Sequence, residues 1–412
     1  MSRQCRICKW WEFDMVIDFG FPPLVNSLLD EKDLEKPDQK YSLIVERCTN
    51  CGLVQIVDPV ESHKIYQDQD YLYFTGDMPQ NSDYMKAFDG LVDELMKQSN
   101  LDDLVVEIGS NDGTVLERFV GRRTLGVDPA TNVVTRALAK AIPTLCAEFN
   151  KQVASNIKKE FGPAKIVGGA NCLAHIHDIH SVLEGVEELL DDDGVFWVEC
   201  NYWGGMVKAK HYALIYHDHY SYFTLQNWID LLAMHKMMIF DAYITEAQGE
   251  GLSLRLYAKK QVTEQTERFK ELEKREKVEQ PNSQEICDKY RDDVTLEAKK
   301  LNNLLFELKQ KGARIAGYGA AAKGFAILHL AQINSEVIDY FVDDSEVKQG
   351  KYTPITRIPV ISRKEAESKL PDFFFITAPN YAKIIIEKEK ALGYKGNFIL
   401  ADATIIYGNK QE

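Results

Sequence analysis

The stretch LVVEIGSNDGTVL, residues 104–116, decides the fold of the central part of this chain. It begins with a short apolar run that is typical of a buried strand, and it continues into a turn that contains Gly109 and Gly113. Glycine lets the backbone turn tightly and approach a ligand closely. Because a helix pattern follows the turn, the stretch indicates the strand–turn–helix unit of an α/β nucleotide-binding fold.

An acidic residue follows this unit at a distance that suits a nucleotide. The second strand pattern, TLGVDPA, contains Asp128, 19 residues after Gly109, where a carboxylate accepts hydrogen bonds from ribose hydroxyls. The turn is not the full G-x-G-x-x-G, and its Glu107 and Asp112 would repel a phosphate. They favour a cationic ligand such as S-adenosylmethionine, with a purely structural turn as the alternative. The predicted cofactor contacts are Glu107, Gly109, Asn111, Asp112, Gly113, Asp128, Pro129 and Asn171.

Further strands are predicted in KIVGGA and VFWVEC, with a helix in HSVLEGVEELLDDDG between them and another over residues 83–99. His175 lies just past the first of these strands, in NCLAHIHDIH. Open α/β sheets bind ligands at their strand ends. His175 is therefore a candidate site residue, and a structural histidine is the alternative.

Four of the eight cysteines form two pairs, Cys5-x-x-Cys8 and Cys48-x-x-Cys51. Two residues between cysteines let both sulfurs bind one tetrahedral zinc ion at about 2.3 Å. Four thiolates close the coordination shell, so we predict a structural zinc and no open catalytic position. The 39 residues between the pairs imply that the second pair lies on a hairpin, VERCTNCGLVQI. Two unrelated thiol pairs are the alternative.

The carboxyl-terminal part repeats the strand–turn–helix pattern. A strongly charged segment over residues 259–311, which predicts two helices broken at 281–283, leads into ARIAGYGAAAKGFAILHL. Its Gly317-x-Gly319-x-x-Ala322 is a variant of the nucleotide fingerprint, and Lys323 falls in the first turn of the helix, where amide groups and an ammonium suit a phosphate. About 25 residues on, Asp343 is a plausible ribose or base contact.

Composition bounds the remaining possibilities. The chain has 412 residues, 45% of them hydrophobic, and a net charge of −14. The length implies two or three domains, and the charge argues against a nucleic-acid partner. Without a long apolar run or a signal peptide, we expect a cytoplasmic protein and no membrane partner. The predicted fold is α/β, with two Rossmann-like doubly wound domains (residues 81–258, and 259–412 with the helical connector) and a small zinc-binding domain at residues 1–80.

The segment IYHDHYSYF, residues 215–223, gathers an unusual number of proton donors and acceptors. Three interpretations are open: a metal site, an acid/base site, or a hydrogen-bonded structural turn. In an extended chain His217 and His219 would lie on one face and could chelate a metal. No third ligand is identifiable in the sequence, which weakens the metal interpretation.

In order along the chain, CRIC…CTNCG, VVEIGSNDGTVL, GVDPATN, NCLAHIHD, YHDHYSYFTL and GYGAAAKG…VDDSEVKQGKYTP…IPV resemble the sugar C-methyltransferases of deoxysugar biosynthesis. The resemblance spans nearly the whole chain. It implies a zinc-binding domain, an S-adenosylmethionine-binding Rossmann domain and a carboxyl-terminal Rossmann-like domain that helps to hold the sugar nucleotide. It also implies a monomer.

The resemblance assigns roles to particular residues. The second histidine of the Tyr-His-acid-His motif, His219, is implied as the base, with Tyr216, Asp218, His175 and either Tyr71 or Tyr73 beside it. Implied or predicted substrate contacts are Tyr222, Arg255, Tyr318, Gly319, Lys323, Asp343 and Lys351. The chain departs from the family pattern at Asp218, where glutamate is usual, in YFTGDMP, and in GEGLSLR, which lacks a histidine.

These assignments predict a C-methyltransferase that acts on a nucleotide-linked 4-keto deoxysugar, with dTDP or GDP as the nucleotide. Removal of the proton next to the ketone needs a base and an oxyanion donor. His219 would take the proton, and Tyr216, Tyr73 or His175 would supply the donor. The alternatives are an O-methyltransferase of the same architecture and a non-catalytic sugar-nucleotide-binding protein.

Overall fold

The computed structural model describes residues 3–25, 27–66, 71, 73–247, 249 and 251–408. The chain divides into two compact units. The first combines residues 1–16, 45–209 and 218–287, and the second combines residues 17–44, 210–217 and 288–412. Within the described residues, no helix has both the length and the apolar character that a membrane span needs.

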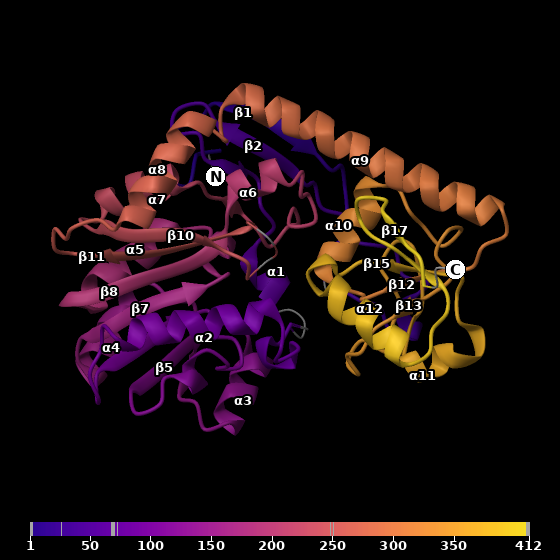
Figure 1. The fold of residues 1–412 in the computed structure, drawn as a ribbon. Coiled ribbons are helices and arrows are strands. Elements are labelled where there is room, and N and C mark those ends of the chain that lie inside the picture. The colour runs from indigo at the N-terminus through magenta and orange to yellow at the C-terminus, as the bar shows by residue number, and fades with distance from the viewer. Residues whose placement is uncertain are drawn as a thin grey trace. The chain divides into compact units, whose positions relative to one another are not determined.

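The central sheet of the first unit has the order β10-β11-β8-β7-β4-β5-β6 (Figure 1). Strands β6, β5, β4, β7 and β8 run parallel, and the antiparallel hairpin β10-β11 joins the β8 edge. The strand order reverses between β4 and β7, the switch point where open α/β sheets bind ligands. The strands are β4 (Leu104–Ile108), β5 (Arg123–Asp128), β6 (Thr144–Cys146), β7 (Ala164–Ala170), β8 (Leu190–Asn201), β10 (Met238–Thr245) and β11 (Ser253–Lys259).

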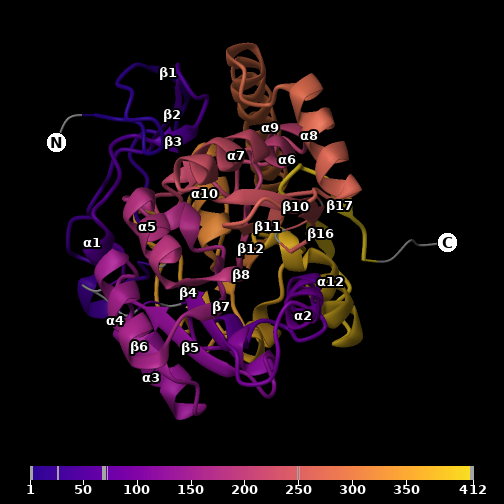
Figure 2. The ribbon, with the colours of Figure 1, turned by 90° about the vertical axis from the view of Figure 1, so that its left-hand side faces the viewer.

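Helices cover both faces of this sheet because successive strand residues point to opposite sides. Leu104 and Val106 pack into the cluster that includes helices α4 and α5, while Val105 packs into the cluster built on α2. Figure 2 shows α4 and α2 on opposite sides of β4 and β7. The helices of this unit are α1 (Ser62–Tyr66), α2 (Asp83–Met96), α3 (Thr131–Ala139), α4 (Lys151–Phe161), α5 (Ile179–Leu189), α6 (Trp203–Lys208), α7 (Leu225–Met234) and α8 (Glu267–Glu279), with 3-10 turns η2 (Thr75–Asp77) and η4 (Leu173–His175).

The prediction of a helix directly after the glycine turn was wrong. The chain forms only a 3-10 turn, η3 (Leu116–Arg118), before β5. The β-branched residues Thr114 and Val115 lower the helix propensity at its start. Gly121, at a φ of +76°, turns the backbone away a few residues later. The turn itself is as expected, with Gly109 at a φ of +64° and Gly113 at +77°.

A second, four-stranded sheet has the order β1-β2-β3-β9. It comprises β1 (Phe13–Asp18), β2 (Ile44–Cys48), β3 (Val54–Ile56) and β9 (Ser221–Tyr222). The predicted hairpin is confirmed, since β2 and β3 are antiparallel and the second cysteine pair lies where β2 turns into β3. The fourth strand comes from the histidine-rich segment, far along the chain.

The second unit contains a six-stranded sheet in the order β14-β13-β12-β15-β16-β17, parallel except for β17. Its order reverses between β12 and β15, which places Gly319, just after β12, at a second switch point. The strands are β12 (Ile315–Tyr318), β13 (Phe341–Val342), β14 (Val360–Ile361), β15 (Phe373–Ile376), β16 (Asn397–Ile399) and β17 (Ile405–Ile406).

Helix α9 (Gln284–Gln310) follows α8, and the predicted break at residues 281–283 is confirmed. The predicted helix with Lys323 in its first turn is α10 (Ala322–Leu330). The remaining helices and 3-10 turns of the second unit are η1 (Glu31–Asp33), α11 (Arg363–Ala366), η5 (Glu367–Lys369), η6 (Pro379–Tyr381) and α12 (Ala382–Ala391).

We expect Gly109→Ala to destabilise the protein by about 1 kcal/mol or more beyond Gly20→Ala. Both glycines have positive φ, +64° and +70°, so alanine is strained at either position. A Cβ at Gly109 would also lie 2.4 Å from Cys172 Cβ, whereas Gly20 has open space around it, and overpacking costs about 1–3 kcal/mol. Urea unfolding of the two variants measures the difference, and equal losses would contradict the close packing at Gly109.

Candidate active site and metal centre

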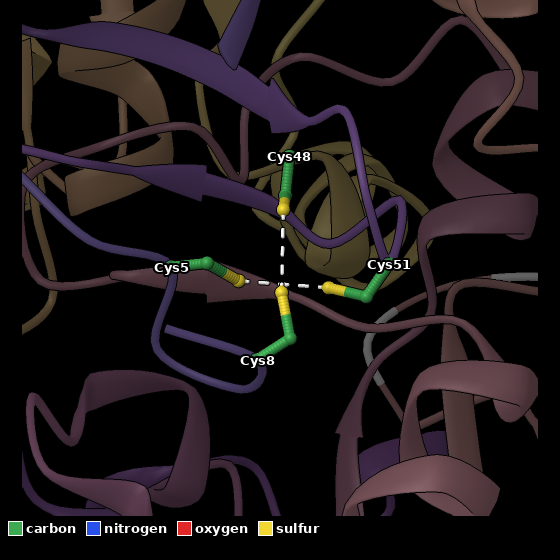
Figure 3. A group of neighbouring side chains, drawn as sticks. All are labelled: Cys5, Cys8, Cys48 and Cys51. Carbon is green, nitrogen blue, oxygen red and sulfur yellow. Dashed lines mark hydrogen bonds between the residues drawn. The ribbon is translucent and has the colours of Figure 1, made fainter. Parts of the chain in front are cut away.

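The four paired cysteines converge on one point (Figure 3). The Sγ atoms of Cys5 and Cys51 are 3.5 Å apart, as are those of Cys8 and Cys48, and all four lie within 4.8 Å of one another. Sulfurs bound tetrahedrally to zinc at about 2.3 Å would be about 3.8 Å apart, so the arrangement fits the ion. Four thiolates leave no position for water or substrate, which makes the centre structural.

Near the end of β4, beside the glycine turn, lies a buried carboxyl group with one unpartnered oxygen. Glu107 is 3% exposed, and its Oε2 atom accepts no hydrogen bond. Burial and the nearby charges of Asp128 and Asp112 raise the pKa of Glu107 well above its usual range. A cationic ligand in this turn would offset the burial of the carboxyl group and the repulsion from the neighbouring carboxylates. The site therefore fits the positive charge of S-adenosylmethionine.

Asp128 holds the glycine turn in place. Its Oδ2 accepts from the backbone N–H of Asn111 at 3.0 Å, and its Oδ1 accepts from that of Ala130 at 2.9 Å. Burial nevertheless raises the pKa of Asp128. Each oxygen keeps a second lone pair, so the carboxylate can still accept from ribose hydroxyls. Pro129 follows directly, in the connection between β5 and α3.

Asp112 is engaged by the protein itself. Its carboxylate accepts from Thr114 Oγ1, from Lys140 Nζ at 2.9 Å and from the backbone N–H of Gly76. Burial would raise its pKa, but the hydrogen bonds from Thr114 and Lys140 outweigh burial and lower it. Asp112 therefore fixes the shape of the turn.

The segment that contains the two candidate tyrosines covers this turn. Asn111 donates to the carbonyl of Tyr73 at 3.1 Å and accepts from the backbone N–H of Thr75 at 2.8 Å. The hydroxyl of Tyr73 donates to that of Tyr84 at 3.2 Å. The ring of Tyr71 lies 6.5 Å from that of Tyr73, and burial raises the pKa of both phenols well above the usual range.

The turn after β7 brings two predicted residues to the same edge of the sheet. Asn171 has a left-handed φ of +54°, and its Oδ1 is buried without a partner. The ring of His175 lies 4.8 Å from the ring of His219. Burial lowers the pKa of His175 to about 4, so its imidazole is neutral at physiological pH.

His219 is also contacted by a residue that the sequence analysis missed. The Nδ2 atom of Asn201, at the end of β8, lies 3.1 Å from His219 Nδ1 and 3.3 Å from its Nε2. The Oδ1 of Asn201 is buried without a partner. Tyr222 packs edge-on at 6.2 Å between ring centroids. The signal for Asn201 was available, because polar residues at the carboxyl ends of parallel strands face the ligand crevice.

The acid of the motif is deeply buried. Asp218 is 2% exposed and its Oδ1 has no partner. Burial raises the pKa of Asp218 to about 7.

The Tyr-His-Asp-His motif divides between the two units. Tyr216 and His217 belong to the second unit, and Asp218 and His219 belong to the first. His217 contacts the carbonyl of Tyr41 at 3.1 Å within its own unit. Across the described ranges, the four cysteines are the single group of three or more His, Cys, Asp or Glu side chains that lie close enough together to bind one metal ion.

Arg255, a predicted substrate contact, forms a buried ion pair with Glu199. It is 2% exposed, and it pairs with Glu199 while donating to the hydroxyl of Tyr243 at 3.1 Å and the carbonyl of Ala87 at 2.7 Å. The buried ion pair is thus fully hydrogen-bonded beneath the end of β8, and Arg255 lies within the protein rather than at its surface.

The second unit brings together most of its predicted contacts at its own switch point. Gly319 has a φ of +93°, and the neighbouring Ala320 donates its N–H to Asp343 Oδ2 at 2.7 Å. Burial lowers the pKa of Lys323 to about 7. Tyr318 is buried at the end of β12. Lys351 lies apart, with its ammonium 2.6 Å from Asp30.

The parallel sheet, the acidic glycine turn at its switch point and the histidine cluster beside it define a Rossmann-like methyltransferase. Three family models agree: a zinc binding domain matches residues 5–66, a methyltransferase domain matches 81–235, and a C-methyltransferase C-terminal domain matches 248–401. The chain is 32% identical over 407 residues to the C-methyltransferase NovU of Streptomyces niveus, and the match covers 96% of this chain and 94% of that protein.

The chain therefore belongs to the C-methyltransferase family, as a methyltransferase that uses S-adenosylmethionine and carries a zinc-binding domain. Solved structures show weaker likeness. An S-adenosylmethionine-dependent methyltransferase from Clostridium acetobutylicum matches at 12% identity and a TM-score of 0.36, over 45% of this chain and 93% of that one. The geranyl diphosphate C-methyltransferase of Streptomyces coelicolor matches at 12% identity and a TM-score of 0.34, over 43% of this chain and 78% of that one.

Freshly purified protein should contain one zinc ion per chain, and Cys51→Ser should lose it together with the fold of the zinc-binding domain, because three thiolates bind zinc far more weakly than four. Cys146→Ser, at an exposed cysteine outside the cluster, is the matched control and should keep the metal. Elemental analysis and thermal unfolding measure both effects. Zinc-free wild-type protein, or full zinc retention in Cys51→Ser, would refute the assignment.

Asp218 should make stability depend on pH. Its folded pKa of about 7 is above the ordinary value of an aspartate, so the stability associated with the neutral carboxyl is complete below about pH 4 and is lost as the pH rises through about 7. The loss amounts to about 1.4 kcal/mol for each pH unit in that window. Asp218→Asn stays neutral, so its melting temperature relative to wild type should rise between pH 5 and pH 8.5.

The control for this experiment is Asp93→Asn, at an exposed aspartate on α2. It should track the wild type at both pH values. If the advantage of Asp218→Asn is the same at pH 5 and pH 8.5, the Asp218 carboxyl does not titrate in this window.

Proposed function

We propose that this enzyme methylates the carbon next to the keto group of a nucleotide-linked 4-keto deoxysugar, with His219 as the base. The observation that carries the proposal is the position of His219, against His175 and Asn201 at the carboxyl ends of β7 and β8. The cofactor turn after β4 lies at the same edge of the sheet. Members of this family transfer a methyl group to carbon, which favours a C–H group over a hydroxyl as the methyl acceptor.

The reaction needs a base for a weakly acidic proton. An imidazole nitrogen of His219 takes the proton, and the electrons of the broken C–H bond pass to the keto oxygen as an enolate. The side-chain amide of Asn201 lies against both ring nitrogens of His219 and limits the orientations of the ring. When bound, S-adenosylmethionine supplies an electrophilic methyl group, and methyl transfer leaves S-adenosylhomocysteine.

Neutral hydrogen-bond donors near His219 can stabilise the enolate oxygen. His175 stays uncharged because burial holds its pKa near 4, and a neutral imidazole can donate one hydrogen bond without losing a proton. Tyr73 is a further donor. Asp218, with a pKa of about 7, can share the charge that His219 gains when it becomes protonated.

The cofactor and the substrate would then contact different loops. For S-adenosylmethionine we propose the turn from Glu107 to Gly113, together with Asp128 and Asn171. Within the second unit, we propose the loop of Gly319 and the first turn of α10 as a site that suits a diphosphate. There, backbone N–H groups, the positive helix end and the ammonium of Lys323 favour an anion, and a phosphate would raise the lowered pKa of Lys323.

His219→Asn should lower the turnover number by roughly 10²- to 10⁴-fold, the usual contribution of a positioned base. Its affinity for S-adenosylmethionine should stay within about twofold of wild type, because the cofactor contacts lie in other turns. The measurement is S-adenosylhomocysteine release from a panel of dTDP- and GDP-linked 4-keto sugars, with cofactor binding measured by calorimetry.

His217→Asn is the matched control, since this histidine lies two residues away and contacts the carbonyl of Tyr41. It should keep most of the activity, whereas chelation of a metal by both histidines would make the two variants equally inactive. Exchange of the substrate C–H proton in D2O offers a second measurement. Equal exchange in wild type and His219→Asn would show that another residue is the base.

A further inference from the structure

The histidine-rich segment is part of the zinc-binding sheet. Directly after His219, strand β9 pairs antiparallel with β3, with Val54 opposite Tyr222 and Gln55 opposite Ser221. The backbone N–H of Ile56 donates to the carbonyl of Tyr220 at 3.0 Å. The strand that fixes the proposed base is therefore hydrogen-bonded to the hairpin that contains the second cysteine pair.

A buried arginine from the first cysteine pair reaches the same carbonyl. Arg6 lies between Cys5 and Cys8 and is 4% exposed. Its guanidinium donates to the carbonyl of Tyr220 at 3.0 Å and to that of Ile56 at 2.6 Å. It also donates to the Oε1 of Gln55 at 3.1 Å and lies 5.4 Å from the ring centre of Tyr220.

Gln55 links this arginine to the metal centre. Its Oε1 accepts from both the backbone N–H and the side chain of Arg6, and its Nε2 lies 3.3 Å from Cys5 Sγ. A cysteine ligand, Gln55 and Arg6 thus form one continuous set of contacts that ends on the residue after His219. Every group in it is buried, so each bond depends on fixed partners.

The other side of the segment is tied to the methyltransferase sheet. Phe223 forms a parallel bridge with Tyr202, the residue after β8, and its carbonyl accepts from the N–H of Trp203 at 2.9 Å. His219 is therefore placed by two sheets: the end of β8, which also carries Asn201, and the zinc-binding sheet. If the pairing with the zinc-binding sheet loosened, the ring of His219 could rotate away from Asn201 without any change at the proposed cofactor turn.

We propose that Arg6 is a positioning residue for the proposed base, through which the four-cysteine centre holds His219 in its reactive orientation. The inference rests on the proposed function for its catalytic consequence. The metal takes no part in the reaction, and it acts by ordering the loop from which Arg6 extends. A displacement of about 1 Å at a reacting group can cost a hundredfold in rate, so the loss of one buried guanidinium is enough to affect turnover.

The test is Arg6→Met, which keeps the apolar length of the side chain and removes its donors. Arg47→Met is the matched control, because Arg47 lies in β2 of the same sheet and donates to Asp14 and the carbonyl of Asn282, away from the histidine segment. Four quantities are measured for each: zinc content, S-adenosylmethionine affinity, turnover, and amide hydrogen exchange of peptides covering residues 216–224.

We expect Arg6→Met to retain one zinc per chain and cofactor affinity within about twofold, while turnover falls roughly 10- to 100-fold and exchange over residues 216–224 speeds at least tenfold. Arg6→Lys should recover part of the turnover, because an ammonium can still donate to one of the two carbonyls. Arg47→Met should leave both the exchange of this segment and turnover near wild type.

Turnover and exchange in Arg6→Met that match those of Arg47→Met would overturn the proposal. So would a loss of turnover that only parallels zinc loss or a general increase in exchange. If Arg6→Met fails to fold, Arg6→Lys is compared with Arg47→Lys. A smaller loss of turnover with faster exchange over residues 216–224 in Arg6→Lys alone supports the proposal, and equal values in the two variants overturn it. Exchange, zinc content and cofactor affinity need no sugar, so absence of turnover in the wild type would count against the proposed function alone.

Discussion

The active-site edge of the first unit depends on the close approach of two turns, those after β4 and β7. The thiol of Cys172 donates to the carbonyl of Ile108 at 2.9 Å. A Cβ on Gly109 would lie 2.4 Å from Cys172 Cβ, and a Cβ on Gly169 would lie 2.5 Å from Cys172 Sγ, which is closer than non-bonded atoms can approach. Because no side chain fits between the turns, the proposed cofactor loop and the turn that carries His175 are held as one edge. The contact therefore sets the position of His175 relative to the glycine turn after β4.

The two glycine loops of the chain have opposite electrostatic character. The loop after β4 is surrounded by buried carboxyl groups whose pKa values burial raises, above all Glu107. The loop after β12 has Lys323 in the helix that follows, with Lys348 donating to the carbonyl of Ala320 at 3.1 Å. A cation suits the first loop and an anion the second. Two loops of similar backbone shape are thus suited to different ligands by the charges placed around them.

Local patterns in the sequence were sufficient for the central strands β4, β5, β7, β8 and β12, the cysteine hairpin and the break between α8 and α9, since each depends on neighbours a few residues away. The helix predicted after the glycine turn does not form, because the β-branched residues Thr114 and Val115 disfavour its start and Gly121 turns the backbone away a few residues later. The role of Arg255 as an internal partner of Glu199, and the contact of Asn201 with His219, depend on strand pairing across long separations. Nothing in residues 215–223 alone indicates that their last part joins the zinc-binding sheet.

Strand β9 has a consequence for the order in which this chain can fold. About 165 residues separate Ile56, at the end of β3, from Ser221. During synthesis the cysteine hairpin is complete early, yet the outer edge of β3 stays unpaired until the whole methyltransferase sheet up to β8 has emerged. Unpaired edges invite association with other chains, and distant pairings form slowly. Metal binding to the nascent hairpin would shorten the time during which its loops are disordered, but it cannot supply the missing strand. The amino-terminal segment is therefore no separable module, and a cut placed between it and the rest would leave a sheet with one strand too few.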